Sequence, residues 1–167
     1  MTSIKAAGGS EIRRLVAADW AVLRQVRLAA LADTPYAFSS TLERELSLDE
    51  RQWRAWIASA AYFMAWRDGQ PAGLAAGLPG AGDAWRLVSM WVSPQARGSG
   101  IADGLVQAVC ACAQASGAAL ISLWVTDVNA RAWAFYRRMG FASTGARQLV
   151  RPQEPDHWEE QVARQLG

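Results

Sequence analysis

The stretch that decides the fold is VSMWVSPQARGSGIA, which occupies residues 88–102. It begins as an apolar strand, which a Ser-Pro pair ends, and a glycine-rich turn then leads into a helix expected over 99–115. Free N–H groups and the positive dipole end at the start of a helix bind anions. Gly98 and Gly100 have no Cβ, so a pyrophosphate can approach the main chain there, and Arg97 adds a positive charge.

The same turn excludes two commoner phosphate-binding motifs. It lacks the Gly-Lys-Ser or Gly-Lys-Thr of a P-loop, and only two glycines stand at the offsets of the dinucleotide-binding G-x-G-x-x-G. A Gly-Ser-Gly turn is also an ordinary connector between a strand and a helix. From the turn alone, both interpretations stay open.

Periodicity and turn signals predict the elements around this stretch. We expect strands over Glu11–Leu15, Tyr62–Trp66, Pro71–Leu78, Trp85–Val92, Leu120–Val125, Phe141–Gln148 and His157–Leu166. We expect helices over Asp19–Leu31, from Ser47 to Ile57 or Ala60, over Ser99–Ala115 and over Asn129–Met139. Ser47 and Glu50 have the spacing of a capping box that would start the second helix, and Asp68-Gly69 is typical of a hairpin turn.

The predicted order of elements is β-α-α-β-β-β-α-β-α-β-β, which indicates an α/β (α+β) fold. Strand-helix-strand units centre on 85–92 and 120–125, so part of the sheet must be parallel. We expect a mixed sheet with helices on both faces. The length of 167 residues favours a single domain over 1–167, with residues 1–10 as a flexible lead.

Composition excludes several classes of protein. With 19% charged and 51% hydrophobic residues, the chain is neither disordered nor fibrous. The net charge is +2 and the arginines are dispersed, so we expect no nucleic-acid partner. There is no run of about 18 apolar residues and no signal-peptide pattern, so we expect no membrane association and a cytoplasmic location. The high aromatic content is compatible with a homodimer.

Cysteine and histidine usage argues against a metal site and a hydrolase. Cys110 and Cys112 are two residues apart in a predicted helix, where side chains do not face each other, so no disulfide is expected. A metal site would need more ligands than these two, so we expect no metal. His157 is the sole histidine, and no G-x-S-x-G motif accompanies it to suggest a serine hydrolase.

The stretch over 88–102 resembles the main cofactor motif of the GNAT superfamily of N-acetyltransferases. That motif is R/Q-x-x-G-x-G/A after a hydrophobic strand that ends in Val-x-Pro, and Arg97, Gly100 and Ala102 fill its three defined positions. Gly98 and Ile101 are also typical of it. The resemblance implies one acetyl-CoA-dependent domain with a GNAT-like mixed, mostly antiparallel central sheet and a parallel βαβ centre.

The resemblance also assigns the cofactor-binding residues. It implies that the backbone amides over 97–102, Ser99 included, hold the pyrophosphate of coenzyme A. It further implies that main-chain groups of Met90, Trp91 and Val92 bind the pantetheine arm like an added strand.

A second GNAT-like signature follows about 30 residues later. The chain reads NARAWAFYRRMGF over 129–141, and it fits the family pattern at Asn129, Ala132, Tyr136, Gly140 and Phe141. Asn129 could cap the helix, contact the cofactor arm, or do both. Tyr136 could be a packing residue, whereas the resemblance places its hydroxyl near the CoA sulfur. Since a tyrosine has a pKa of ~10 and a thiol ~8.5, it would stabilise the leaving thiolate rather than transfer its proton fully.

The proton acceptor is where the sequence departs from the family pattern. An alkyl amine has a pKa of ~10.4 and must lose a proton before it attacks a thioester. Many GNAT members place a Glu early on the central strand for this purpose, but here Arg86 stands there. Asp83, Glu43 or a water chain on main-chain carbonyls are the candidates, with ordinary solvated acids as the alternative.

Substrates of this superfamily enter between the first two helices and the loop that joins the last two strands. The corresponding segments are 35–45 and 151–157, and we take Phe38 and Glu43 as candidate substrate residues. The acids of these segments would attract a cationic amine; they are Glu43, Glu45, Glu154 and Asp156.

The leading functional hypothesis is an acetyl-CoA-dependent N-acetyltransferase. It would transfer the acetyl group to a primary amine of a small molecule by direct attack in a ternary complex. A protein acetyltransferase acting on lysine or an N-terminus is an alternative, and an open peptide groove would favour it. A non-catalytic CoA-sensing module on the same fold is another alternative, because an obvious base is missing.

Overall fold

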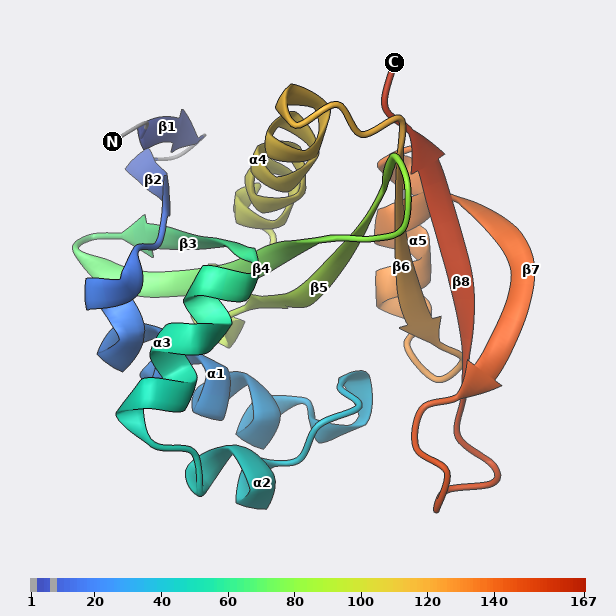
Figure 1. The fold of residues 1–167 in the computed structure, drawn as a ribbon, viewed down its shortest axis with the longest axis horizontal. Coiled ribbons are helices and arrows are strands. Elements are labelled where there is room, and N and C mark those ends of the chain that lie inside the picture. The colour runs from blue at the N-terminus through green and yellow to red at the C-terminus, as the bar shows by residue number, and fades with distance from the viewer. Residues whose placement is uncertain (1–2, 7–8) are drawn as a thin grey trace.

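The structure is a computed structural model that describes residues 3–6 and 9–167, and its centre is one mixed sheet (Figure 1). In the described part of the chain the sheet has eight strands in the order β1-β2-β3-β4-β5-β6-β8-β7. The strands are β1 (Ser3–Ala6), β2 (Ser10–Arg14), β3 (Ala61–Arg67), β4 (Gln70–Pro79), β5 (Ala84–Val92), β6 (Leu120–Thr126), β7 (Ala142–Leu149) and β8 (Trp158–Gln165). The β5–β6 pair is parallel and the other pairs are antiparallel.

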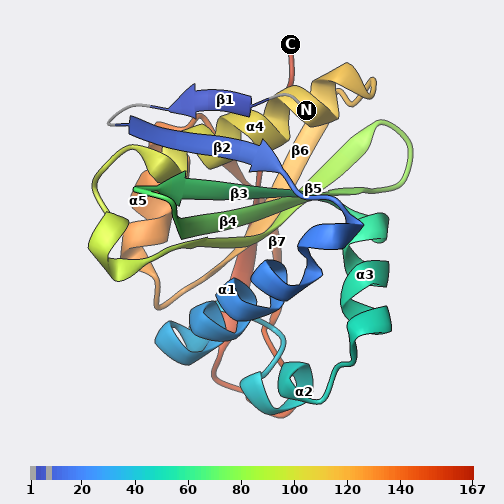
Figure 2. The ribbon, with the colours of Figure 1, turned by 90° about the vertical axis from the view of Figure 1, so that its left-hand side faces the viewer.

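Helices cover both faces of the sheet, as Figures 1 and 2 show. The helices are α1 (Trp20–Asp33), α2 (Leu42–Leu46), α3 (Glu50–Ser59), α4 (Ile101–Ala115) and α5 (Ala130–Arg138). Apolar residues of α1 and α3 pack into one core on one face, and those of α4 and α5 pack into a second core on the other. The predicted fold class, with its parallel centre and two helical layers, is confirmed.

The sheet divides between β5 and β6. These strands pair only over 84–86 and 120–122, and beyond that point they separate. β5 contains a bulge within the separated part. Its register with β4 shifts between Val88 and Trp91, and the intervening Ser89 has a φ of +57°. Bulges of this kind increase the local twist of a strand. The edge of β5 over 87–92 that faces β6 is therefore left without a partner strand.

The hairpin turn between β3 and β4 is confirmed. Asp68 and Gly69 both have positive φ, of +51° and +74°. This conformation matches the twist of the two flanking strands, and Asp-Gly adopts it readily.

Three predictions about the N-terminal third are corrected. The capping box of α3 is formed by Asp49 and Gln52, not by Ser47 and Glu50. Ser47 instead ends α2, a five-residue helix that was not predicted. Residues 3–6 of the expected flexible lead form β1, which pairs with β2. Residues 1–2 and 7–8 of that lead lie outside the described residues.

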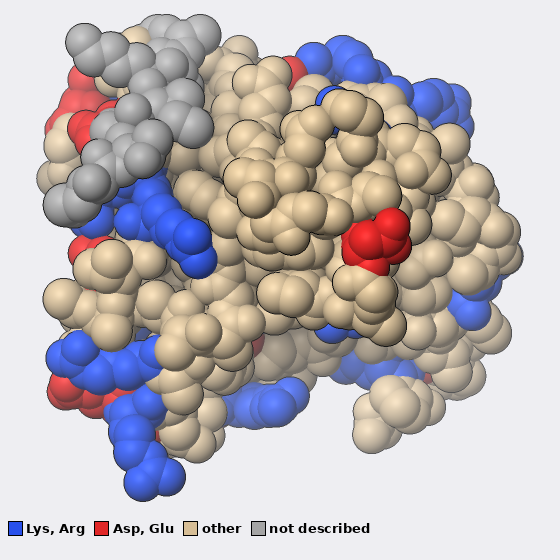
Figure 3. All heavy atoms as spheres, turned by 45° about the horizontal axis from the view of Figure 1, so that its top comes forward, with Lys and Arg blue, Asp and Glu red and all other residues tan. Residues whose placement is uncertain are grey.

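The charged residues are dispersed over the surface. On the face of Figure 3, uncharged residues cover most of the centre, and Lys and Arg side chains lie mainly around the rim. None of the helices in the described part of the chain has the length and apolarity needed to cross a bilayer.

Candidate active site

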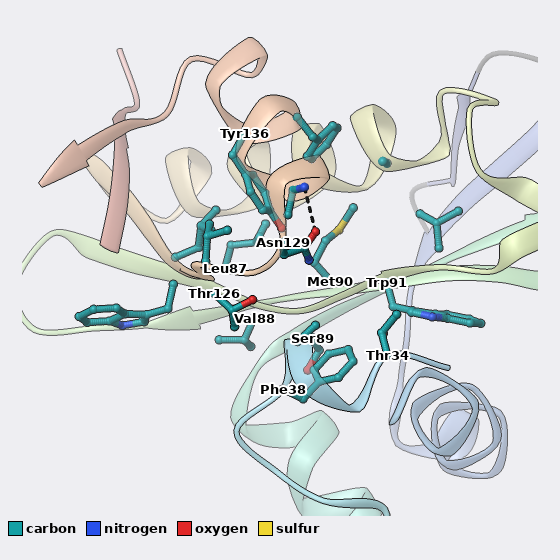
Figure 4. Close-up of a pocket in the computed structure, with 18 of the residues that line it drawn as sticks. Thr34, Phe38, Leu87, Val88, Ser89, Met90, Trp91, Thr126, Asn129 and Tyr136 are labelled. Carbon is teal, nitrogen blue, oxygen red and sulfur yellow. Dashed lines mark hydrogen bonds between the residues drawn. The ribbon is translucent and has the colours of Figure 1, made fainter. Parts of the chain in front are cut away.

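A cleft of about 1010 Å³ opens where β5 and β6 separate (Figure 4). Both strands line it, together with α5, the glycine turn before α4 and the segment over 34–39 that follows α1. Elements far apart in the sequence thus meet along one continuous surface. The part of this surface that borders Phe38 and the loop between β7 and β8 is called the acceptor end below.

The glycine turn has the geometry of an anion site. Gly98 and Gly100 have φ of +79° and +84°, a region that L side chains rarely adopt, and Gly100 is the N-cap of α4. Both glycines line the cleft, as does Ala102. The Ser99 hydroxyl donates to the Ala96 main-chain oxygen at 2.6 Å and Ile101 is buried in the core, and neither residue is among those that line the cleft.

Two groups hold the Arg97 side chain in place. Its Nε donates to the Val92 carbonyl oxygen at 3.1 Å, and its guanidinium pairs with Asp33. Asp33 also accepts a hydrogen bond from Trp91 Nε1 at 2.9 Å. Arg97 therefore ties the glycine turn to the end of β5 and to α1. The Val92 carbonyl, expected to serve the pantetheine arm, already accepts from this arginine.

The free edge of β5 forms one wall of the cleft. Met90, Trp91 and Val92 all line it. The indole of Trp91 belongs to the core beside α1, whereas Met90 packs against the core beside α4 and α5. With these side chains directed to the two faces of the sheet, the main chain between them borders the gap left by β6.

Asn129 and Tyr136 form the opposite wall (Figure 4). Asn129 Oδ1 accepts from the Ala132 N–H at 3.1 Å, so its role as helix cap is confirmed. The Tyr136 ring packs edge-on against Phe135 and Phe141, with centroids 5.0 and 5.6 Å away. Among the described residues, none exchanges a hydrogen bond with its hydroxyl. Burial raises the pKa of Tyr136 above its ordinary value, so the hydroxyl stays protonated and available as a donor.

The loop between β7 and β8 closes the acceptor end. Arg151 Nη2 donates to the main-chain oxygens of Pro35 at 2.9 Å and Phe38 at 3.0 Å, and the same guanidinium pairs with Glu154. Glu154 also contacts His157 Nδ1 at 2.8 Å. Hydrogen bonds from His157 and Arg151 hold the pKa of Glu154 below its ordinary value. The charge of Glu154 is thus already engaged within its own loop.

The candidate acceptor residues differ in their positions. Phe38 lines the cleft, with the Arg27 guanidinium 4.7 Å from its ring centre. Glu45 does not attract a substrate cation as expected, because it is 0% exposed and binds Arg27 through bonds of 2.8–3.1 Å. Glu43 and Asp83 are exposed, and neither is among the residues that line the cleft.

The sequence did not reveal a row of polar residues that crosses β6, β8 and β7. Thr126 of β6 lies opposite Glu159 of β8, which lies opposite Gln148 of β7, and all three line the cleft. Gln148 Nε2 donates to Glu159 Oε1 at 2.7 Å. Burial raises the pKa of Glu159 above its ordinary value. Only the pairing of three strands brings these residues together, so no local motif marks them.

The sequence comparison decides the family. The sequence model described as the acetyltransferase (GNAT) family matches residues 24–141, which is more than half of the chain. The chain belongs to this GNAT family. Membership implies acyltransferase activity, and it places both predicted motifs within the matched region.

Solved structures share the GNAT fold at low sequence identity. A GNAT acetyltransferase from Streptococcus pneumoniae has a TM-score of 0.80 at 17% identity, covering 95% of this chain and 99% of that chain. Ribosomal-protein-alanine N-acetyltransferase from Brucella melitensis has 0.75 at 22%, covering 93% and 99%. PaiA N-acetyltransferase from Thermoplasma acidophilum, solved in complex with coenzyme A, has 0.71 at 16%, covering 93% and 98%. None of the curated proteins compared with the sequence matches it.

The residues of the cleft fit acetyl-CoA, the co-substrate that GNAT membership implies. The turn at Gly98 and Gly100 leaves main-chain N–H groups open to a pyrophosphate. The free edge of β5 suits an extended pantetheine arm, since that arm carries amide groups. The unpartnered hydroxyl of Tyr136 borders the same channel. Hydrogen-bond donors therefore border the cleft along the length that acetyl-CoA would occupy.

Proposed function

We propose that this protein is an N-acetyltransferase that moves the acetyl group of acetyl-CoA to a primary amine of a small molecule. The observation that carries the proposal is the cleft itself. The glycine turn, the free edge of β5 and Tyr136 border it, and the polar residues Thr126, Gln148 and Glu159 line the same cleft. Such an arrangement supports direct attack, with both substrates bound in one ternary complex.

Each wall of the cleft has a distinct task in this reaction. Acetyl-CoA supplies an acyl group activated as a thioester. The main chain beside Met90 orients the arm that carries it, and Arg97 fixes the turn that would hold the pyrophosphate. Tyr136 stays protonated, so it can donate a hydrogen bond to the sulfur as negative charge develops there.

The closed acceptor end favours a small molecule over a protein substrate. Arg151 joins the loop after α1 to the β7–β8 loop, through hydrogen bonds to residues 116 and 113 positions away in the sequence. An extended peptide would need an open groove at this position. The closure instead leaves room for an amine surrounded by Phe38, Ser89 and Val150.

Calorimetry with acetyl-CoA, CoA and NADH tests the cofactor half of the proposal. We expect micromolar binding of acetyl-CoA and CoA, and none of NADH, because the turn lacks the dinucleotide fingerprint. Absence of acetyl-CoA binding by folded protein would refute the proposed activity.

Thiol release with a panel of amines tests the acceptor half. The panel contains amino-acid amides, di- and polyamines, aminoglycosides and a short peptide with an N-terminal alanine. Turnover confined to the small amines is the expected result. Faster turnover of the peptide would favour the protein acetyltransferase, and cofactor binding without any turnover would favour a sensing module.

A further inference from the structure

Glu159 faces the acceptor side of the sheet. Val162, on the same strand, lies in the core beside α4 and α5, as does its partner Leu123 on β6. Side chains alternate along a strand, so Glu159 and its partner Thr126 point to the opposite face, where α1 lies. Figure 4 shows the labelled members of the two sides, with Tyr136 above the strands and Phe38 below them. The cleft therefore lies between the tyrosine hydroxyl and this carboxyl.

The immediate partners of Glu159 leave part of the carboxyl group free. Gln148 binds Oε1, and within the described part of the chain no side chain binds Oε2 or forms an ion pair with this glutamate. The Thr126 hydroxyl beside it is buried and also has no partner in the structure. A buried hydroxyl without a hydrogen-bond partner costs free energy, so we expect a polar group of the ligand to form a hydrogen bond with it.

The charges around Glu159 act at longer range. Burial raises the pKa of Glu159, and this effect outweighs those of His157, directly before β8, and Arg86 of β5, which lower it. A carboxylate with a raised pKa accepts protons more readily than an ordinary glutamate does. Arg86 occupies the position at which the family pattern has an acid, and the glutamate that lines this cleft comes from a different strand, β8.

We propose that Glu159 is the proton acceptor of the transfer reaction and that Thr126 binds the incoming amine. The inference rests on the proposed acetyltransferase activity. The nitrogen lone pair forms a bond to the thioester carbon, and the C–S bond breaks with its electron pair passing to sulfur. The ammonium form of the amine first gives one proton to the Glu159 carboxylate, which passes it to solvent, and the nitrogen loses its second proton by the same route once the bond to carbon has formed. The thiolate takes up one proton from solvent. The products are the N-acetylated amine and CoA.

The first test compares Glu159→Gln with Glu160→Gln. Glu160 is the next residue of β8, points to the opposite face and contacts the Ser143 hydroxyl, which makes it a matched control. With the best amine of the panel, we expect kcat of the Glu159 variant to fall about 100- to 10,000-fold. Its affinity for acetyl-CoA should stay that of the wild type, and the Glu160 variant should keep its kcat.

The second test uses the pH dependence of kcat at saturating amine. The Gln148 hydrogen bond lowers the pKa of Glu159, so removal of this donor in Gln148→Leu should raise that pKa. The acidic limb of the profile should then move to higher pH, and in Glu159→Gln it should disappear. A residue that only supports the fold would not produce this shift.

The outcomes separate the two proposals. Equal kcat for the Glu159 and Glu160 variants, or a limb that stays in place in Gln148→Leu, would overturn the role of Glu159 alone. Lack of turnover by the wild type with every amine would overturn the acetyltransferase activity, and the role of Glu159 with it.

Discussion

Two side chains with opposite proton requirements border one cleft. Tyr136 is packed between aromatic rings and burial raises its pKa, which keeps it a donor. Burial also raises the pKa of Glu159, which for a carboxyl group strengthens proton acceptance. The same physical cause thus prepares a hydrogen-bond donor for the leaving sulfur and an acceptor for the amine proton.

Replacement of Tyr136 by phenylalanine isolates the contribution of its hydroxyl. The ring contacts with Phe135 and Phe141 remain, and the hydroxyl has no partner in the described structure, so thermal stability should not fall. We expect kcat to drop about 100- to 1,000-fold, as for other lost donors to a developing negative charge. Steady-state kinetics and acetyl-CoA calorimetry check this. Wild-type kcat across the pH range would contradict the donor role.

Local motifs revealed only part of the candidate site. Arg97, Gly100 and Tyr136 stand in short patterns, so the sequence alone placed them. Glu159 and Arg151 carry no such signal, because their function depends on partners brought near by strand pairing and loop closure. For Glu45 the prediction was wrong. Its charge suggested a substrate contact, but its side chain is buried in an ion pair with Arg27.

At the scale of elements, α2 is anchored by a buried ion pair. Glu45 of α2 accepts three hydrogen bonds from Arg27 of α1, and Arg27 Nη1 reaches the Ser89 hydroxyl at the bulge of β5 at 3.3 Å. This set connects two helices to the strand that forms the cleft wall. A five-residue helix has little stability of its own, so this contact keeps it in place.

Loss of the Glu45 charge should destabilise the protein strongly. Glu45→Gln leaves Arg27 buried without its counter-ion, for which we expect a loss of about 3–5 kcal/mol in the free energy of unfolding. Glu50→Gln, which breaks the exposed pair with Arg54, is the control and should cost about 0.5 kcal/mol or less. Urea unfolding measures both. Similar losses for the two variants would show that the buried pair does not stabilise the fold.

Two glycines, one at the start of α4 and one after its end, allow backbone strain and cofactor binding to be measured separately. Gly100 and Gly117 share a φ of +84°, but only Gly100 borders the cleft. Alanine at either position should cost about 1–2 kcal/mol of stability, because of the left-handed backbone. Only Gly100→Ala should weaken CoA binding, since its methyl group would occupy the approach of the pyrophosphate. Calorimetry that finds equal CoA affinity in both variants would contradict this placement.

Long periodic elements were predictable and short ones were not. The strands around Asp68-Gly69 follow from apolar runs on either side of a turn signal, and the helix over 130–138 follows from its motif and the glycine at 140 that ends it. The cap of α3 was assigned to Ser47 because Ser and Asp are both good N-caps, and Asp49 forms the actual box with Gln52. β1 was missed because four residues carry too little periodicity to identify a strand.

On the scale of the whole molecule, Arg151 connects the loop between β7 and β8 to the segment that follows α1, across the acceptor end. Arg151→Ala should open this end, raise KM for the preferred amine and admit bulkier amines, while acetyl-CoA affinity stays unchanged. Arg147→Ala is the control, since it removes an exposed arginine of β7 that pairs with Asp127. Kinetics with amines of graded size check this. Identical KM values and size preferences in both variants would show that the Arg151 contacts do not restrict the acceptor.

The separation of β5 and β6 has a consequence for the durability of the protein. With acetyl-CoA bound as proposed, its pantetheine arm pairs with the edge of β5 over 87–92, and the gap between β5 and β6 is filled only in the loaded molecule. Each catalytic cycle then empties and refills this gap. Since a ligand that binds the folded state stabilises it more as its concentration rises, resistance to proteolysis and heat should increase with the concentration of CoA thioesters.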